Sequence, residues 1–262
     1  MARMRSKRHA PSREDFMLNE QRKTEQGIFD HNTMRTLGKL FSKGIVSKLD
    51  HLIARGKEAD VYIAEAGDSE IVKGQQLIVL KFFRIEATAF SNMKDYILGD
   101  PRFERQVGRG RYSIINTWCK KEFGNLSIAI QAGVHAPTPY VYSGNILAMQ
   151  FLGNRETIAP TLLDAELENP EQTLKHIIKD VGRLFSYGLV HADLSEYNIL
   201  IHGGLPYMID FGQAISIKHP RAPEFLKKDL TNVLKFFRKR YKIEDSLEKC
   251  YGEVISKNVR KD

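Results

Sequence analysis

A short hairpin with polar residues at its open end is the feature that most constrains the fold of this chain. Residues 199–201 and 206–209 are mostly apolar, and His202-Gly203-Gly204 between them is a turn signal. Two short apolar runs around a glycine-rich turn predict a pair of antiparallel strands. Because such a pair returns the chain on itself, Asn198 and Asp210 are expected to lie near one another. There a carboxamide oxygen and a carboxylate can share one oxygen-seeking cation.

The segment before this hairpin completes a longer motif. His191-Ala192-Asp193 is followed after four residues by Asn198, and Asp210-Phe211-Gly212 begins twelve positions after Asn198. Protein kinases carry His-Arg-Asp-x-x-x-x-Asn and then Asp-Phe-Gly, in which the first Asp orients the attacking hydroxyl and the Asn and second Asp hold Mg²⁺. Here Ala192 replaces the Arg. A surface hairpin that carries these residues by chance is the alternative, but the joint match favours a phosphoryl-transfer centre.

Composition limits the class of protein. The chain has 262 residues, of which 42% are hydrophobic and 27% charged, as in a soluble globular protein with a large core. No apolar run approaches the roughly eighteen residues that span a bilayer, and no apolar segment follows the N-terminal charges. The two cysteines, Cys119 and Cys250, do not make a disulfide framework. We therefore expect a cytoplasmic protein without a membrane partner.

The net charge of +8 is unevenly distributed. Residues 1–23 hold seven Lys/Arg against three Asp/Glu, residues 99–121 hold six against two, and residues 227–262 hold eleven against six. Basic segments on a faintly acidic body suggest an anionic macromolecular partner, with nucleic acid ahead of membrane. The alternative is that these charges solvate tails and helix faces.

Strand and helix patterns predict two lobes. Residues 1–26 read as a polar arm and residues 30–53 as helical, whereas residues 61–64 and 77–83 read as an antiparallel pair of strands. A long loop at 91–112 precedes a helix at 114–132, and a strand at 146–153 ends at a glycine-bearing connector. Helices are predicted at 170–187 and 224–241. We expect an α+β fold with a basic arm and N-terminal helical extension (1–49), a smaller lobe (50–152) and a helical lobe (153–262).

Two charged residues occupy positions that the apolar pattern predicts to be buried. Lys81 ends the apolar run 78–80, and Glu122 lies on the inward stripe of the helix, four residues after Trp118 and four before Leu126. A carboxylate that is buried alone is costly, so we expect Glu122 and Lys81 to pair. In kinases the corresponding lysine contacts the α/β-phosphates and is positioned by a helix glutamate. The alternative is two side chains that reach solvent separately.

The phosphate-binding loop is a weak match to its pattern. Aligned on Val61, residues 54–61 retain Gly56 but place Ala54 and Ala59 where Gly-x-Gly-x-x-Gly-x-Val has glycines. The loop precedes Lys81 by twenty residues and lies at a strand edge, which supports the assignment. With fewer glycines, it should be stiffer than the usual loop.

Three segments resemble the RIO family of atypical protein kinases, and within it the Rio-one subfamily: residues 56–62, 118–126 and 191–198. Residues 29–59 and 220–237 also resemble that subfamily, and the compact ends resemble archaeal members. The resemblance implies a two-lobed protein-kinase-like fold, with a small, mainly antiparallel β N-lobe carrying one key helix and a reduced helical C-lobe lacking a full activation segment. It further implies ATP and Mg²⁺, with Mn²⁺ as an alternative metal.

The same resemblance assigns an activity and individual roles. It implies autophosphorylation or Ser/Thr phosphorylation and an ATPase role in maturation of the small ribosomal subunit, with rRNA and ribosomal proteins as partners. Asp193 would be the catalytic base, Asn198 and Asp210 the metal ligands, and Asp210 also the site of a phospho-aspartate. The remaining cofactor-binding residues would contact phosphates or adenine, and they are Gly56, Lys57, Glu58, Ala59, Val61, Lys81, Glu122, Met149, Gln150 and Leu152.

Departures from ordinary kinases favour slow turnover without peptide docking. Ala192 replaces the Arg that usually binds a phosphorylated activation loop. Ser195 occupies the position at which many kinases have a Lys near the transferred phosphate. Residues 222–224 begin only ten positions after Gly212, so we expect Pro223 and Glu224 simply to start a helix.

Two other functions fit parts of the pattern. A small-molecule phosphotransferase of the aminoglycoside-kinase type shares the His-x-Asp-x-x-x-x-Asn loop, although residues 56–62 and 195–197 speak against it. An RNA-associated assembly factor that uses ATP as a conformational ligand is supported by the basic segments and by Ser195. The protein substrate is not predicted.

Overall fold

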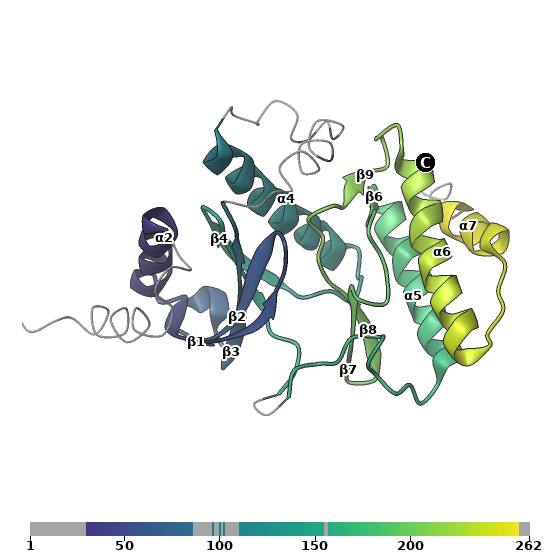
Figure 1. The fold of residues 1–262 in the computed structure, drawn as a ribbon, viewed down its shortest axis with the longest axis horizontal. Coiled ribbons are helices and arrows are strands. Elements are labelled where there is room, and N and C mark those ends of the chain that lie inside the picture. Colours follow the sequence, from purple (N-terminus) through teal and green to yellow (C-terminus); the bar gives the residue numbers. More distant parts are fainter. Residues whose placement is uncertain are drawn as a thin grey trace, which may run out of the picture.

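The computed structural model describes residues 30–85, 110–154 and 157–256, together with Tyr96, Asp100 and Arg102. The polar arm predicted at 1–26 and most of the loop predicted at 91–112 lie outside the described residues. In the rest of the chain a β-sheet with two flanking helices is followed by a mainly helical half (Figure 1). No helix among the described residues has the length and apolar content needed to cross a bilayer.

The first half is built on an antiparallel sheet of five strands in the order β1-β2-β3-β5-β4. The predicted pair at 61–64 and 77–83 is confirmed as β2 and β3, which run antiparallel with Val61 opposite Lys81. The bounds are β1 Val46–Arg55, β2 Ala59–Ala66, β3 Leu77–Phe83, β4 Pro139–Ser143 and β5 Ile146–Gln150, with the 3-10 turn η1 at Glu70–Val72.

The helix predicted over residues 30–53 is wrong in its second part. Helix α2 covers only His31–Ser42, capped by the Asp30 carboxylate, and β1 follows it. Gly44 adopts a left-handed φ of 65° and ends the helix, since such a residue cannot continue it. In β1, register shifts place Val46 and Leu49 on one buried face despite their spacing of three residues. This irregular strand therefore mimics helical periodicity in the sequence.

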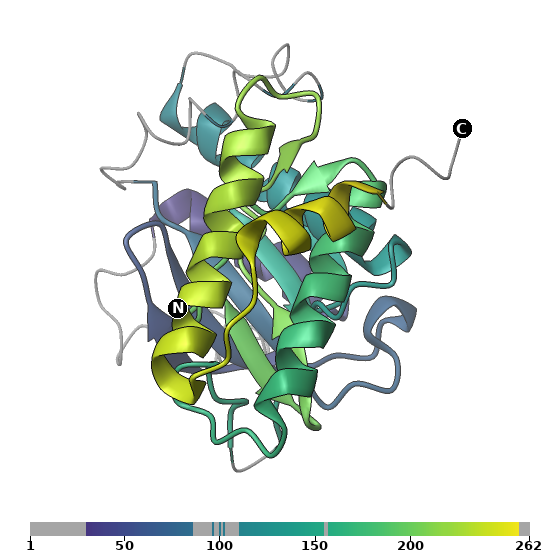
Figure 2. The same ribbon diagram turned by 90° about the vertical axis from the view of Figure 1, so that its right-hand side faces the viewer.

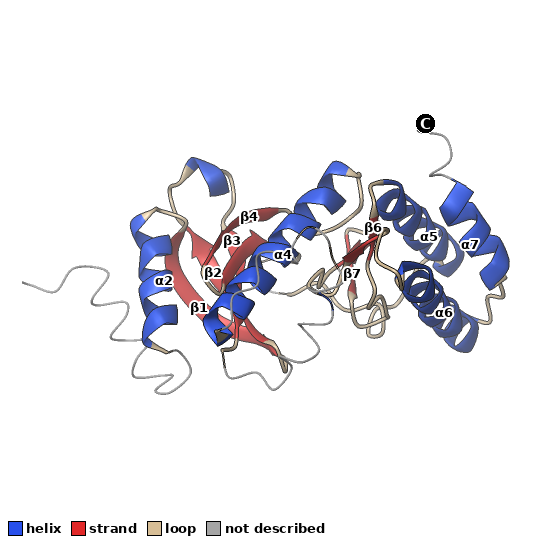
Figure 3. Ribbon diagram, turned by 90° about the horizontal axis from the view of Figure 1, so that it is seen from above, coloured by secondary structure: helices blue, strands red, loops and turns tan. Residues whose placement is uncertain are grey.

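The two faces of the sheet pack against different partners. Ile78, Leu80 and Phe82 of β3 share a core with α2, whereas Phe83 on the opposite face joins the core that contains α4 (Arg111–Gln131). Because successive strand residues alternate in direction, Lys81 faces the α4 side. Figure 3 shows the sheet between α2 and α4, with the helical half beyond α4.

The second half consists of three helices and two short strand pairs. Helix α7 packs across α5 and α6 (Figure 2). Helices were predicted at 170–187 and 224–241, and α5 and α6 confirm both, α6 starting two residues earlier with a proline in its first turn as expected. The bounds are α5 Pro170–Ser186, α6 Ala222–Tyr241, α7 Leu247–Ser256, β6 Leu189–Val190, β7 Ile199–His202, β8 Leu205–Met208 and β9 Ile215–Ser216.

Candidate active site

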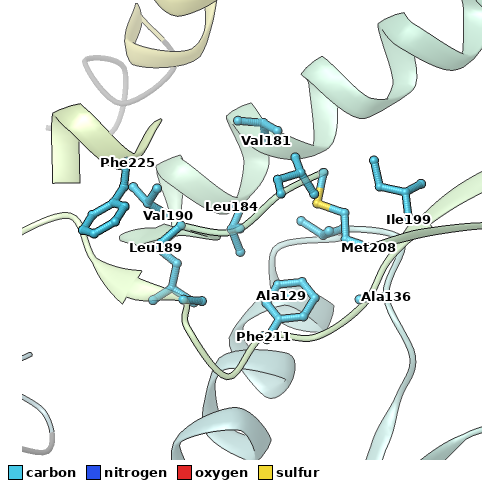
Figure 4. Close-up of a cluster of buried hydrophobic side chains, with 14 of the residues drawn as sticks. Ala129, Ala136, Val181, Leu184, Leu189, Val190, Ile199, Met208, Phe211 and Phe225 are labelled. Atoms are coloured by element: carbon cyan, nitrogen blue, oxygen red, sulfur yellow. The ribbon is translucent and has the colours of Figure 1, made fainter. Parts of the chain in front are cut away.

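The predicted hairpin at the centre of the motif is confirmed. Strands β7 and β8 pair with Ile199 opposite Met208, and the Ile209 N–H donates to the Asn198 carbonyl oxygen at 3.0 Å. This pairing brings Asn198 and Asp210 to the open end of the hairpin. Phe211 then turns into the core, where it is fully buried near Ala129 of α4 (Figure 4).

Lys81, Glu122 and Asp210 form one charged cluster. The Lys81 ammonium lies 2.8 and 2.9 Å from the two carboxylate oxygens of Glu122 and 3.0 Å from the Asp210 carboxylate. Burial alone lowers the pKa of Lys81, but the carboxylates of Asp210 and Glu122 outweigh it, so its pKa is raised and the amine stays charged. Burial raises the pKa of Asp210, yet Lys81 more than offsets this and holds it below its ordinary value.

Asp193 lies beside this cluster and is supported by Asn198 and Lys228. The Asn198 amide donates to the Asp193 carbonyl oxygen at 2.8 Å and lies 3.4 Å from its carboxylate. Since the NH₂ group makes these contacts, the carboxamide oxygen is the atom available to a cation. Burial raises the pKa of Asp193, and Lys228 at 3.7 Å works against that rise. Lys228 comes from α6 and was not predicted.

Asp229, also on α6, holds the backbone around Asp193 and was likewise missed. Its carboxylate is 1% exposed and accepts from the N–H groups of Ala192 and Leu194, each at 2.8 Å. Ala192 has a left-handed φ of 68°, which an alanine rarely adopts without external support. The two hydrogen bonds supply that support and fix the direction in which Asp193 points.

The loop predicted to cover phosphates is closed by its own backbone. The Gly56 N–H donates to the Ala59 carbonyl at 2.9 Å, and the Glu58 carbonyl accepts from the Arg84 N–H at 2.9 Å. Burial, together with the charge of Asp210, raises the pKa of the Glu58 carboxyl, which places Glu58 electrostatically within the site. Lys57 is exposed. These positions are compatible with the predicted contacts to nucleotide, which stay predictions.

The predicted adenine contacts lie where the sheet ends. Met149 and Gln150 are the last two residues of β5, and the Gln150 N–H donates to the Thr138 carbonyl oxygen at 2.8 Å. Leu152 is buried and its carbonyl accepts from Ala159 at 3.0 Å, which anchors the connector to the second half. Their contact with a base stays a prediction.

The donor set suits Mg²⁺ that is shared with a nucleotide. Among the described residues, no group of three or more His, Cys, Asp or Glu side chains could hold a metal by itself. Asn198 and Asp210 provide one amide oxygen and one carboxylate, and Mg²⁺ is commonly bound through one or two such ligands plus phosphates and water. The residues therefore fit a metal that arrives with its nucleotide.

Comparison with known proteins places this architecture in a family. A family model described as the RIO domain matches residues 60–250. The chain is 40% identical over 221 residues to the RIO-type serine/threonine-protein kinase Rio1 of Haloferax volcanii. This alignment covers 84% of this chain and 74% of the relative. It is 34% identical to the Rio1 of Methanocaldococcus jannaschii over 92% of this chain and 80% of the relative. The chain belongs to the RIO family.

Other RIO proteins extend the comparison. The human serine/threonine-protein kinase RIO1 is 33% identical over 82% of this chain, which spans only 38% of the human protein. Among solved structures, the Rio2 kinase of Chaetomium thermophilum matches with a TM-score of 0.65 at 21% identity, covering 84% of this chain and 67% of that one. The same kinase as an ADP/Mg²⁺-phosphoaspartate complex matches with a TM-score of 0.64 at 18% identity, covering 94% and 75%. The expected kinase-like RIO fold is thereby confirmed.

Proposed function

We propose that this RIO-family chain is a cytoplasmic Mg-ATP-dependent phosphotransferase that acts on serine or threonine, with accompanying ATPase activity. The observation that carries the proposal is the convergence of Lys81, Glu122 and Asp210, with nitrogen-to-oxygen distances of 2.8 to 3.0 Å, next to Asp193 and Asn198. A charged lysine held in place by two carboxylates is suited to bind the α/β-phosphates. Bound Mg²⁺ would supply neutralisation of charge on the transferring phosphates.

Asp210 has the properties of a nucleophile as well as a ligand. Its side chain is 47% exposed, and the pKa of its carboxyl is held down by Lys81 against burial, so it is ionised at neutral pH. A Rio2 structure at 18% identity is described as a phosphoaspartate complex. We infer that an Asp210 oxygen attacks the γ-phosphorus of ATP, the bond from that phosphorus to the β,γ-bridging oxygen breaks, ADP leaves, and an acyl phosphate remains.

Asp193 completes the cycle. It takes the proton of a water molecule or a Ser/Thr hydroxyl whose oxygen attacks the phosphorus of the acyl phosphate, and Asp210 departs as a carboxylate. Water gives ATPase turnover, and a hydroxyl gives protein phosphorylation or autophosphorylation. Ser195 provides no cation near the transferred phosphate. Kinases typically turn over at roughly one per second or faster, and the turnover number of this chain should be lower than that.

Labelling with γ-phosphate-labelled ATP tests this function. Wild-type protein should acquire a label that hydroxylamine removes, Asp210→Asn should acquire none, and Asp193→Asn should accumulate the label because the second step lacks its base. Asp50→Asn on the exposed edge of β1 is the matched control and should behave like the wild type. A label in Asp210→Asn that resists hydroxylamine would contradict the acyl phosphate. Absence of both labelling and ATP hydrolysis in the wild type would contradict phosphotransfer.

A partner of polyanionic character is supported by the exposed side of α6. Seven exposed cations lie on α6 or just after it: Lys227, Lys228, Lys235, Arg238, Lys239, Arg240 and Lys242. The exposed acidic residues of the same described stretch are Glu224 on the helix and Glu244 and Asp245 after it. We propose that this surface contacts RNA of a small-subunit ribosomal precursor, near the site because Lys228 reaches Asp193. A small alcohol or sugar as the acceptor is the competing function, and a metabolite panel tests it.

The RNA proposal predicts a salt dependence. Each lost phosphate contact should reduce the slope of log affinity against log salt by about 0.7 to 0.9. In the triple variant Lys235→Glu, Arg238→Glu, Lys239→Glu, the slope should fall by the equivalent of at least two phosphate contacts. In Lys73→Glu, on the exposed turn of the β half, the slope should not change. An unchanged slope in the triple variant would contradict this surface.

A further inference from the structure

Helix α4 attaches the Asp210-Phe211-Gly212 turn through buried polar side chains that the proposed chemistry does not use. The Lys121 ammonium donates to the Gly212 carbonyl at 2.7 Å and to the Ala214 carbonyl at 2.6 Å. One turn further along the helix, the Asn125 amide donates to the Phe211 carbonyl at 2.9 Å and to the Ala214 carbonyl at 3.0 Å. Both side chains are 0% exposed.

A third contact closes the gap between the helix and the turn. Gly212 lies so close to Trp118 that a Cβ atom at position 212 would be 3.0 Å from the indole Nε1. The Lys121 ammonium lies 5.1 Å from the centre of the same indole ring. Trp118 therefore packs against Gly212, while Lys121 and Asn125 bind the carbonyls of the turn. Glu122 of the same helix reaches Asp210 through Lys81. We name Lys121 and Asn125 with their carbonyl partners the α4 clamp.

The turn requires such support because it is not a locally favoured conformation. Asp210 has a φ of 63°, in the left-handed region that residues other than glycine rarely occupy. The peptide groups that follow Asp210 are the ones whose carbonyls the clamp binds. If the turn flipped away, the Lys121 ammonium and the Asn125 amide would both be left in the core without acceptors.

Lys121 is also an expensive residue at this position. Burial lowers the pKa of its ammonium to about 7, and the Gly212 and Ala214 carbonyls that accept from it carry no charge. An apolar side chain of similar length fills a core without that desolvation, and replacing buried charged groups by apolar ones is often neutral or stabilising. Stability alone therefore does not account for a lysine here, whereas fixing the turn does.

We propose that Lys121 and Asn125 are positioning residues, which hold the Asp210 carboxylate in its metal-binding place before any ligand arrives. This rests on the proposed function, in which Asp210 is a ligand of Mg²⁺. The α4 helix and the turn then form one rigid unit, so that the metal half-site is assembled in the nucleotide-free protein. Switching by movement of this helix against the turn, as protein kinases use, is closed to this chain while the clamp is intact.

The single tryptophan of the chain is a built-in reporter of this contact, because Trp118 lies against Gly212. In the 262-residue chain, tryptophan emission is recorded without ligand, and then ADP binding is titrated with and without Mg²⁺. The test variants are Lys121→Met and Asn125→Leu. Lys120→Met and Asn116→Leu, on the exposed side of the same helix, are their matched controls.

The clamp predicts weaker metal binding with unchanged nucleotide binding. Both test variants should lose about tenfold or more in Mg²⁺ affinity, the range measured when residues that orient a metal ligand are removed. Their affinity for metal-free ADP should match the controls, their ligand-free emission should shift, and Lys121→Arg should recover part of the Mg²⁺ affinity. If Lys121→Met or Asn125→Leu does not fold, Asn125→Ser removes the Asn125 amide donors with a smaller change in volume than Asn125→Leu.

The outcomes separate the clamp from the function on which it rests. Wild-type Mg²⁺ affinity in both test variants, with or without a shifted emission, would overturn the clamp and leave the phosphotransferase proposal standing. An equal loss of affinity for metal-free ADP and for Mg-ADP would show a merely structural role and would also overturn it. A wild-type protein that binds ADP without any response to Mg²⁺ would overturn both proposals.

Discussion

Replacing Lys81 by methionine removes the cation that faces Glu122 while keeping a side chain of similar length. The Glu122 side chain is 1% exposed, whereas that of Asp210 is 47% exposed. Water can therefore take the place of Lys81 at Asp210 but not at Glu122. The expected loss of folding free energy in Lys81→Met is therefore the cost of leaving one buried carboxyl group, that of Glu122, without its partner.

The size of that cost follows from the proton that the carboxyl must take. Starting from an ordinary glutamate pKa of about 4.3, protonation costs about 4 kcal/mol at pH 7, about 2 at pH 6 and about 1 at pH 5. These figures are upper limits on the difference from the wild type, in which burial already raises the pKa of Glu122 to about 7. Burial already raises the pKa of Glu122 and Lys81 opposes this rise, so its removal raises the folded-state pKa further. A group whose pKa is higher in the folded than in the unfolded state loses stability as the pH rises. The deficit of the variant relative to the wild type should therefore grow from pH 5 to pH 8.

Urea unfolding followed by Trp118 emission between pH 5 and 8 measures this difference. Lys81→Met/Glu122→Gln is the control, because the neutral amide has no proton to take, and its stability should depend less on pH than that of Lys81→Met. A deficit in Lys81→Met that does not change with pH would refute the reasoning. So would a double variant that retains the full deficit and its pH dependence.

Three further changes test the rest of the site. Asp229→Asn removes one of two acceptors for the loop around Asp193 and should cost about 1–3 kcal/mol in the free energy of unfolding; urea unfolding measures it, and a loss below about 0.5 kcal/mol would contradict that role. Because Lys228 restrains the rise in the pKa of Asp193, Lys228→Met should move the acid limb of the kcat/KM profile to higher pH, and an unmoved limb is the contrary result. Gly212→Ala places a Cβ against Trp118 and should cost about 1–3 kcal/mol with a shifted emission maximum, while an unperturbed thermal transition would speak against that contact.

The features predicted correctly from sequence are those with a local signal or an energetic necessity. The β7–β8 hairpin follows from two apolar runs around His202-Gly203-Gly204, which specify the turn without help from the rest of the chain. The contact between Lys81 and Glu122 spans 41 positions, yet it was predicted because each charge occupied a buried position and needed the other.

The features that were missed depend on tertiary packing. Strand β1 carries a helical spacing of apolar residues because of its register shifts, and only pairing with β2 reveals it. Lys121 lies three residues after Trp118, and Asn125 three residues after Glu122, so the spacing was available, but polar residues at the margin of a helix stripe are usually solvated. Asp229 lies between apolar residues of α6 and gave the same ambiguous signal. Their burial is decided by the segments that cover them.

The placement of α4 in the larger core changes where this molecule can come apart. In the sequence, α4 precedes the connector at Leu152. Even so, Ile115, Trp118 and Leu126 of α4 belong to the same hydrophobic cluster as residues of α5 and α6. The face of the sheet that points away from α4 packs with α2 in a second cluster. Subglobal unfolding follows such clusters rather than chain order. A fluctuation that separates the sheet from α4 and the helical half must also break the contacts of α4 with β4 and β5, and the boundary between the two units would then run between Lys81 and Glu122. The ion pair of Lys81 and Glu122, which prepares the site for phosphate, is thus also a contact that holds two cooperative folding units together.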